Sequence, residues 1–146
     1  MSTELFAQTV NTKLTVKDMP SRREIEAKLA TATERFEIER LERSLGRRDQ
    51  VGDGAENDFA FTVWRLGDAF IVSTPAEPYS RFQIDLRERF PKTTVAVLNL
   101  SDGTTTYLPK PSAFKSDVYQ VRVALYEIDS LEKVTAKACA AIAAMS

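Results

Sequence analysis

The feature that most constrains the fold is an apolar strand followed closely by a helix and a second apolar strand. The first strand covers Ala69–Ser73 and ends before Pro75, and the helix is expected to begin at Pro78, which leaves Glu77 at the junction. The second strand, Thr94–Leu100, follows that helix at once. Two strands joined by a crossover helix form a right-handed βαβ unit with parallel strands.

A hairpin is predicted to lead into this unit. Apolar residues nearly alternate over Phe59–Leu66, and Gly67-Asp68 is a two-residue turn with glycine first. The helix after Glu77 carries apolar residues at helical spacing, at Tyr79, Phe82, Leu86 and Phe90. The segment therefore predicts an α/β fold: a mixed sheet whose hairpin leads into the βαβ unit, with helices packed on the sheet.

The N-terminal part is predicted to hold one strand, a long helix and a loop. The strand lies within Leu5–Val16, and Ser21 with Glu24 forms a capping-box pattern that begins the helix. Apolar residues at Ile25, Leu29, Ala32, Phe36, Ile38, Leu41 and Leu45 continue the helix, and Gly46 is its expected stop. Residues 47–58 are expected to form a surface loop. Arg47-Arg48 would either contact an anion or be a solvated helix end, and we prefer the second because acidic residues follow.

The C-terminal part is predicted to hold a helical turn, a strand and a last helix. The turn covers Ser112–Lys115 and the strand covers Val118–Tyr126, where β-prone residues partly alternate. The helix begins at Asp129 or Ser130 and runs to Met145. Its buried stripe comprises Leu131, Val134, Ala138, Ile142 and Met145. Cys139 lies in this helix, and we interpret it as a small buried hydrophobe rather than a reactive thiol.

Length and charge limit the classes of protein to which the chain could belong. A chain of 146 residues with 43% hydrophobic content suits a single α/β domain over residues 1–146. The formal net charge is −1, so no overall field attracts nucleic acid or an anionic membrane. The sequence shows no membrane span and no signal-peptide pattern. It contains no histidine, which excludes serine–histidine and cysteine–histidine nucleophiles from this chain alone.

Two side chains are candidates for chemistry because each follows a strand of the predicted parallel pair. Glu77 follows Ala69–Ser73 and Tyr107 follows the next strand, so both belong to the same sheet edge, where ligands bind in open α/β sheets. Glu77 would cap the helix that begins at Pro78, and the positive helix end would favour its ionised form. Each also has a purely structural interpretation, with Glu77 bonded to helix amides and Tyr107 anchoring a loop.

Several short motifs stand in an order that resembles a known family. They are Leu66-Gly67-Asp68, Pro75-Ala76-Glu77, a strand ending in Asn99, Gly103, and Tyr107-Leu108-Pro109. In this order they resemble the later part of the neutral ceramidase-like catalytic domain. The resemblance covers roughly residues 59–126, and it implies that the chain is a piece of a larger catalytic domain.

The resemblance implies a zinc-dependent amidase that cleaves the amide bond of N-acyl sphingoid lipids. In the family two histidines, a glutamate and a tyrosine hold the metal, and the last two correspond to Glu77 and Tyr107. The expected partner is the missing N-terminal half or a second chain that supplies the histidines, with a lipid amide as substrate. The resemblance also implies that the parent protein is secreted or periplasmic. A second copy of the chain is a further candidate partner.

The chain departs from the family pattern, and the departures leave two hypotheses. It lacks histidine, the glycine of the Pro-Gly-Glu motif is Ala76, and the later Tyr-Glu motif reads Tyr119-Gln120. We therefore expect the isolated chain to bind no zinc by itself and to be inactive. The first hypothesis is a C-terminal segment of a ceramidase-like hydrolase. The second is a non-enzymatic α/β binding or interaction module with an exposed apolar patch.

Overall fold

The computed structural model describes residues 5–101, 103 and 106–146. Six strands are present in this part of the chain: β1 (Leu5–Thr15), β2 (Glu56–Leu66), β3 (Ala69–Ser73), β4 (Glu77–Pro78), β5 (Thr94–Leu98) and β6 (Tyr107–Leu108). The helices are α1 (Arg22–Leu29), α2 (Arg35–Val51), α3 (Arg81–Arg89), α4 (Tyr119–Val123) and α5 (Ser130–Met145), with a 3₁₀ turn at Pro111–Lys115. None of the helices described is long and apolar enough to cross a membrane.

The main sheet has the strand order β1-β2-β3-β5. β1 and β2 pair antiparallel over their whole length, and β2 and β3 form the predicted hairpin around Gly67-Asp68. β3 and β5 pair in parallel, with Ile71 opposite Ala96, and α3 lies between them in the chain. The mixed α/β sheet and its parallel unit are therefore as the sequence predicts.

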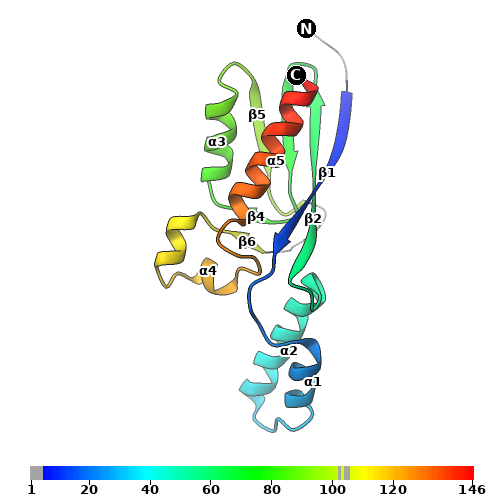
Figure 1. The fold of residues 1–146 in the computed structure, drawn as a ribbon, viewed down its shortest axis with the longest axis vertical. Coiled ribbons are helices and arrows are strands. Elements are labelled where there is room, and N and C mark those ends of the chain that lie inside the picture. The colour runs from blue at the N-terminus through cyan, green and yellow to red at the C-terminus, as the bar shows by residue number, and fades with distance from the viewer. Residues whose placement is uncertain (1–4, 102, 104–105) are drawn as a thin grey trace.

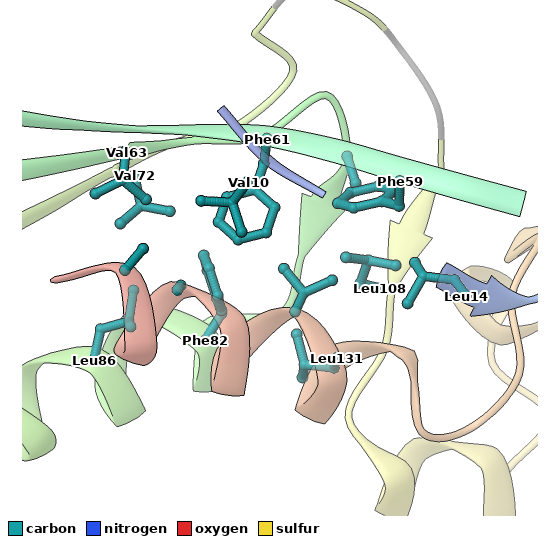
Figure 2. Close-up of a cluster of buried hydrophobic side chains, with 14 of the residues drawn as sticks. Val10, Leu14, Phe59, Phe61, Val63, Val72, Phe82, Leu86, Leu108 and Leu131 are labelled. Atoms are coloured by element: carbon teal, nitrogen blue, oxygen red, sulfur yellow. The ribbon is translucent and has the colours of Figure 1, made fainter. Parts of the chain in front are cut away.

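Helices α3 and α5 cover one face of this sheet. α5 contacts β1 and β2, while α3 contacts β5 and α5 (Figure 1). Between the sheet and these helices lies the core, where Phe59, Phe61 and Val63 of β2 point toward Phe82 and other helix residues (Figure 2). The predicted stripe on α5 is confirmed, since Leu131, Val134, Ala138, Ile142 and Met145 are all buried.

The predicted long N-terminal helix is two helices, which is a correction. The capping box of Ser21 and Glu24 is present and begins α1, but α1 ends at Leu29 and α2 begins at Arg35. The chain reverses direction between α1 and α2, so that α2 packs back against α1. The two helices extend together from one end of the main sheet (Figure 1). Phe36 is consequently 84% exposed rather than buried.

The stop of this helical region also differs from the prediction. Gly46 lies inside α2, and the helix ends at Val51 with Gly52 as its cap at a φ of 70°. Glycine tolerates this left-handed backbone without steric cost, so the end falls there. The predicted loop over residues 47–58 shrinks to the short connection between Val51 and Glu56.

The predicted strand over Val118–Tyr126 is also wrong in its first half. Residues 119–123 form α4, and only the following residues are extended beside the end of β1. There Lys17 N–H donates to Leu125 O at 2.9 Å and Glu127 N–H donates to Thr15 O at 2.9 Å. The β-prone composition was overridden by tertiary contacts, which is common for short segments. The predicted helical turn at Ser112–Lys115 is present as the 3₁₀ turn.

Candidate functional site

Glu77 and Tyr107 are partners in a separate two-stranded parallel sheet. β4 pairs with β6, with Glu77 opposite Tyr107 and Pro78 opposite Leu108. The Glu77 N–H donates to Thr106 O at 2.8 Å, and the Tyr79 N–H donates to Leu108 O at 3.0 Å. The two residues therefore approach each other as expected, but they do so as paired strands of a separate sheet and not at the edge of the main sheet.

The predicted role of Glu77 as a helix cap is wrong. Pro78 belongs to β4, and α3 begins only at Arg81 with Ser80 at the cap position. The physical reason is the pairing with β6, which holds the backbone around Glu77 extended and delays the start of the helix. Glu77 therefore does not stand at the positive end of α3.

Backbone hydrogen bonds fix the segment that carries Glu77 against the chain that follows β5. Thr74 N–H donates to Leu98 O at 2.9 Å, and Leu100 N–H donates to Ala76 O at 3.1 Å. Gly103 lies so close to Pro75 that a Cβ atom at position 103 would stand 3.1 Å from the proline Cβ. Glycine at position 103 thus permits the backbone at that residue to lie close to Pro75.

The two acidic groups interact electrostatically. The Glu77 carboxylate raises the pKa of the Tyr107 phenol above its ordinary value, with partial burial and Tyr119 contributing less. The Tyr107 and Tyr119 rings meet edge to face with centroids 6.2 Å apart. A negative charge on the carboxylate opposes a second negative charge on the phenol, so the pair is a place where a cation would be favoured.

A pocket of about 230 Å³ opens beside this pair. Polar side chains and an apolar wall line it: Arg47, Gln50, Glu77, Leu100, Thr106, Tyr107, Val123 and Leu125. Arg47 and Gln50 come from α2, far from Glu77 in sequence, and sequence reasoning missed them as site residues. The only signal was the anion-contact alternative for Arg47, which we set aside in favour of a solvated helix end.

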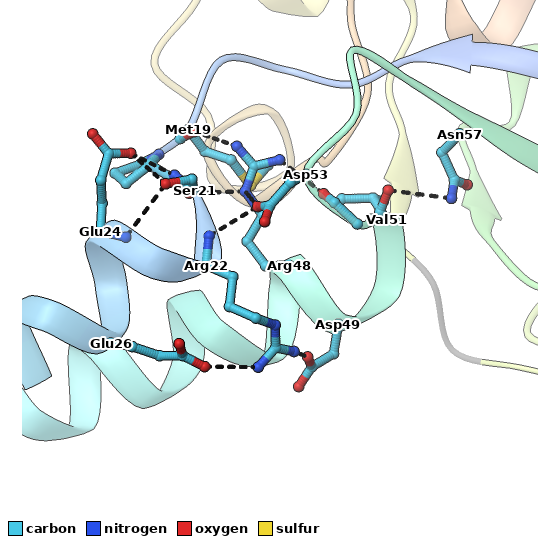
Figure 3. Close-up of polar contacts among 12 residues, drawn as sticks. Met19, Ser21, Arg22, Glu24, Glu26, Arg48, Asp49, Val51, Asp53 and Asn57 are labelled. Atoms are coloured by element: carbon cyan, nitrogen blue, oxygen red, sulfur yellow. Dashed lines mark hydrogen bonds and ion pairs between the residues drawn. The ribbon is translucent and has the colours of Figure 1, made fainter.

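Arg48 holds α2 in the position that brings Arg47 to the pocket. Its side chain is buried, with 7% exposed, so the predicted solvated helix end is wrong for this residue. The guanidinium donates to Pro20 O at 2.8 Å, to Gly52 O at 2.9 Å and to Met19 O, and lies 3.4 Å from the Asp53 carboxylate (Figure 3). These bonds tie the C-terminal end of α2 to the segment between β1 and α1.

The described residues contain no group of three or more His, Cys, Asp or Glu side chains that could hold a metal ion. Glu77 and Tyr107 therefore offer two oxygen donors rather than a complete ligand set. Cys139 is partly buried and packs against the core, and burial raises the pKa of its thiol. This environment agrees with the interpretation of Cys139 as a packing residue.

A comparison with solved structures found a similar fold. A solved structure described as "Ceramidase complexed with C2" superposes on 97% of this chain with a TM-score of 0.59 and 9% sequence identity. The fold is ceramidase-like. The chain spans 30% of that ceramidase chain. No protein-family model matches the sequence, and no curated protein matches it.

Proposed function

We propose that this chain supplies Glu77 and Tyr107 as two ligands of a zinc-dependent amide hydrolase of the neutral ceramidase type. The observation that carries the proposal is the parallel pairing of β4 with β6, which sets Glu77 opposite Tyr107. The ceramidase-like fold supports it. The remaining ligands would be imidazoles from another segment or chain, because these 146 residues contain no histidine.

The two side chains fit such a metal in their donor chemistry. Zinc accepts carboxylate oxygen together with imidazole nitrogen. Its catalytic sites commonly combine three protein ligands with a water molecule. The raised pKa of Tyr107 shows that the carboxylate opposes ionisation of the phenol. A divalent cation would favour both anions and draw the two oxygens together.

The rest of the pocket suits an amide with an apolar chain. Zinc, when bound, lowers the pKa of a water molecule toward about 7 and polarises a carbonyl group. Arg47 and Gln50 offer N–H donors to a carbonyl oxygen, and Leu100, Val123 and Leu125 form an apolar wall for an alkyl group. An N-acyl lipid amide combines these features, and we propose this substrate class.

A zinc titration with added imidazole tests the proposal, because free imidazole replaces the missing nitrogen ligands. We expect zinc to bind the chain under these conditions, and Glu77→Gln or Tyr107→Phe to weaken binding at least about tenfold, since even a lost second-shell partner costs that much. Glu132→Gln and Tyr119→Phe are matched controls: Glu132 is exposed on α5, and Tyr119 touches Tyr107 without pairing with Glu77.

Calorimetry or competition with a zinc indicator would provide the affinities. Equal binding by site variants and controls, or no binding by the wild-type chain, would contradict the proposal. We further expect the chain to show no amidase activity without imidazole, since two oxygen ligands leave the metal site incomplete.

A non-enzymatic interaction module is the second candidate, and a separate observation favours it. Large apolar side chains are exposed on the main sheet, among them Trp64 at 39% and Leu98 at 49%. This module would keep the α/β scaffold and show no dependence on Glu77 or Tyr107. The zinc titration distinguishes the two candidates.

A further inference from the structure

One face of the main sheet is left uncovered by the helices of the described chain. The pairing registers place residues side by side in rows across this face. The first row is Leu5, Leu66, Ala69 and Thr94; the second is Ala7, Trp64, Ile71 and Ala96; the third is Thr9, Thr62, Ser73 and Leu98. We call these three rows the open face. The opposite face of the same sheet carries the core that α3 and α5 cover (Figure 2).

The first two rows of the open face are apolar apart from Thr94. The third row holds Thr9, Thr62 and the buried Ser73 beside Leu98, and no row carries a charge. Leu5 is 68% exposed, Leu66 44% and Leu98 49%, and Trp64 stands in the middle row at 39%. An antiparallel sheet with one solvated face normally alternates apolar inside with polar outside. The first charged residues on this side, Lys13 and Asp58, lie beyond the third row at the far end of β1 and β2.

We propose that the open face is the docking surface for a second copy of this chain, packed sheet on sheet about a twofold axis. A twofold interface requires a patch that is complementary to itself. A neutral, largely apolar face meets this condition, because each copy presents the other with no charge to desolvate.

The middle row adds a size pattern that is symmetric across the sheet. It reads small, large, large, small: Ala7, Trp64, Ile71, Ala96. A twofold axis parallel to the strands lays β2 over β3 of the second copy. Trp64 then lies against Ile71 of the second copy, and Ala7 lies against Ala96 of the second copy, so large residues fill the centre and small ones the margins.

The area of the face sets the expected strength. Strands about 4.8 Å apart that rise about 3.3 Å per residue give roughly 300 Å² for the three rows of the four-stranded open face. Two open faces therefore bury about 600 Å², which is below the size of stable interfaces and typical of weak, transient contacts. The dimer is therefore weak and forms only as the concentration rises.

This dimer does not depend on the proposed zinc site. None of the pocket-lining residues belongs to the open face, and Glu77 and Tyr107 lie in β4 and β6 rather than in the main sheet. The zinc-site proposal and the dimer proposal can therefore be tested independently.

Sedimentation velocity across micromolar to near-millimolar concentrations tests the dimer, together with the fluorescence of Trp64, the single tryptophan. We expect a monomer–dimer equilibrium that stops at two copies, and a blue shift of the emission that follows the dimer fraction as Trp64 is buried. Trp64→Lys and Leu98→Lys should each weaken dimerisation at least about tenfold, because a buried charge has no partner there.

Phe36→Lys is the matched control, since Phe36 is exposed on α2 and lies outside the open face. It should leave the equilibrium unchanged. Circular dichroism would confirm that each variant folds. If Trp64→Lys does not fold, Leu98→Lys remains as the variant that tests dimerisation. A monomer at every concentration would overturn the proposal. So would a dimer that survives both lysine substitutions or leaves the emission unchanged, as pairing through the edge of β1 would.

Discussion

Tyr107 and Glu77 are two acidic side chains that the β4–β6 pairing holds opposite each other. The position of Tyr107 is further defined by its contact with the Tyr119 ring. The carboxylate raises the pKa of the phenol because ionisation of Tyr107 would place a second negative charge beside the first. At this scale the site is a carboxylate beside a phenol whose ionisation the carboxylate opposes.

The electrostatic coupling predicts how Glu77→Gln changes the titration of Tyr107. Removing the carboxylate should lower the pKa of Tyr107 toward the ordinary tyrosine value near 10, so its phenolate should form at lower pH than in the wild-type chain. Ultraviolet titration would measure this, with Tyr107→Phe in both backgrounds to subtract the other tyrosines. An unchanged pKa of Tyr107 would show that the two groups do not interact.

The elements of the fold were predicted from sequence to different extents. The Ser21–Glu24 capping box and the hairpin turn at Gly67-Asp68 are local signals, and both were confirmed. The parallel unit predicted that Glu77 and Tyr107 would come close together, but not that they would pair in a separate sheet. The break between α1 and α2 was missed because the apolar spacing continues through the connection, while packing between the two helices reverses the chain.

Arg48 shows why the pocket residues on α2, Arg47 and Gln50, could not be predicted from the sequence. Nothing in a sequence says that an arginine near a helix end will donate to the carbonyl groups of Met19 and Pro20, far away along the chain. Arg47 reaches the pocket because Arg48 fixes the end of α2. Contacts of this kind between distant segments have no periodic signature.

Replacing Arg48 should therefore destabilise the protein. We expect Arg48→Met to lower the free energy of unfolding by about 2–4 kcal/mol, because charged hydrogen bonds to three carbonyl groups are lost in a buried setting. Urea unfolding followed by circular dichroism would measure it. Arg43→Met, at an exposed position of the same helix, should stay within about 0.5 kcal/mol. If the two variants were equally stable, Arg48 would not anchor α2.

Tyr126 makes the stability of the whole molecule sensitive to alkaline pH. Its side chain is 1% exposed, packs edge to face on Phe59 and donates to the Asn57 Oδ1 at 2.9 Å. Burial raises the pKa of Tyr126 to about 12. Tyr126 ionises near pH 10 in the unfolded chain, so the folded state holds the Tyr126 proton more tightly. The corresponding stability is complete below pH 10 and is lost as the pH rises to about 12.

This linkage predicts the pH dependence of unfolding. The free energy of unfolding should fall between about pH 10 and 12, with Tyr126 contributing on the order of 2 kcal/mol. In Tyr126→Phe that part of the fall should be absent, although the variant should be less stable at neutral pH by about 1 kcal/mol through the lost hydrogen bond. Urea unfolding at several pH values would measure both. Parallel pH profiles for the two proteins would contradict the assignment.

The most direct test of the zinc site is a crystal structure of the chain grown with zinc and imidazole, with data collected at the zinc absorption edge. We predict an anomalous peak between Glu77 and Tyr107, with the carboxylate oxygen and the phenol oxygen each about 2.0–2.2 Å from the metal. Zinc bound only elsewhere on the chain, or a peak that persists between them in Glu77→Gln and Tyr107→Phe, would contradict it.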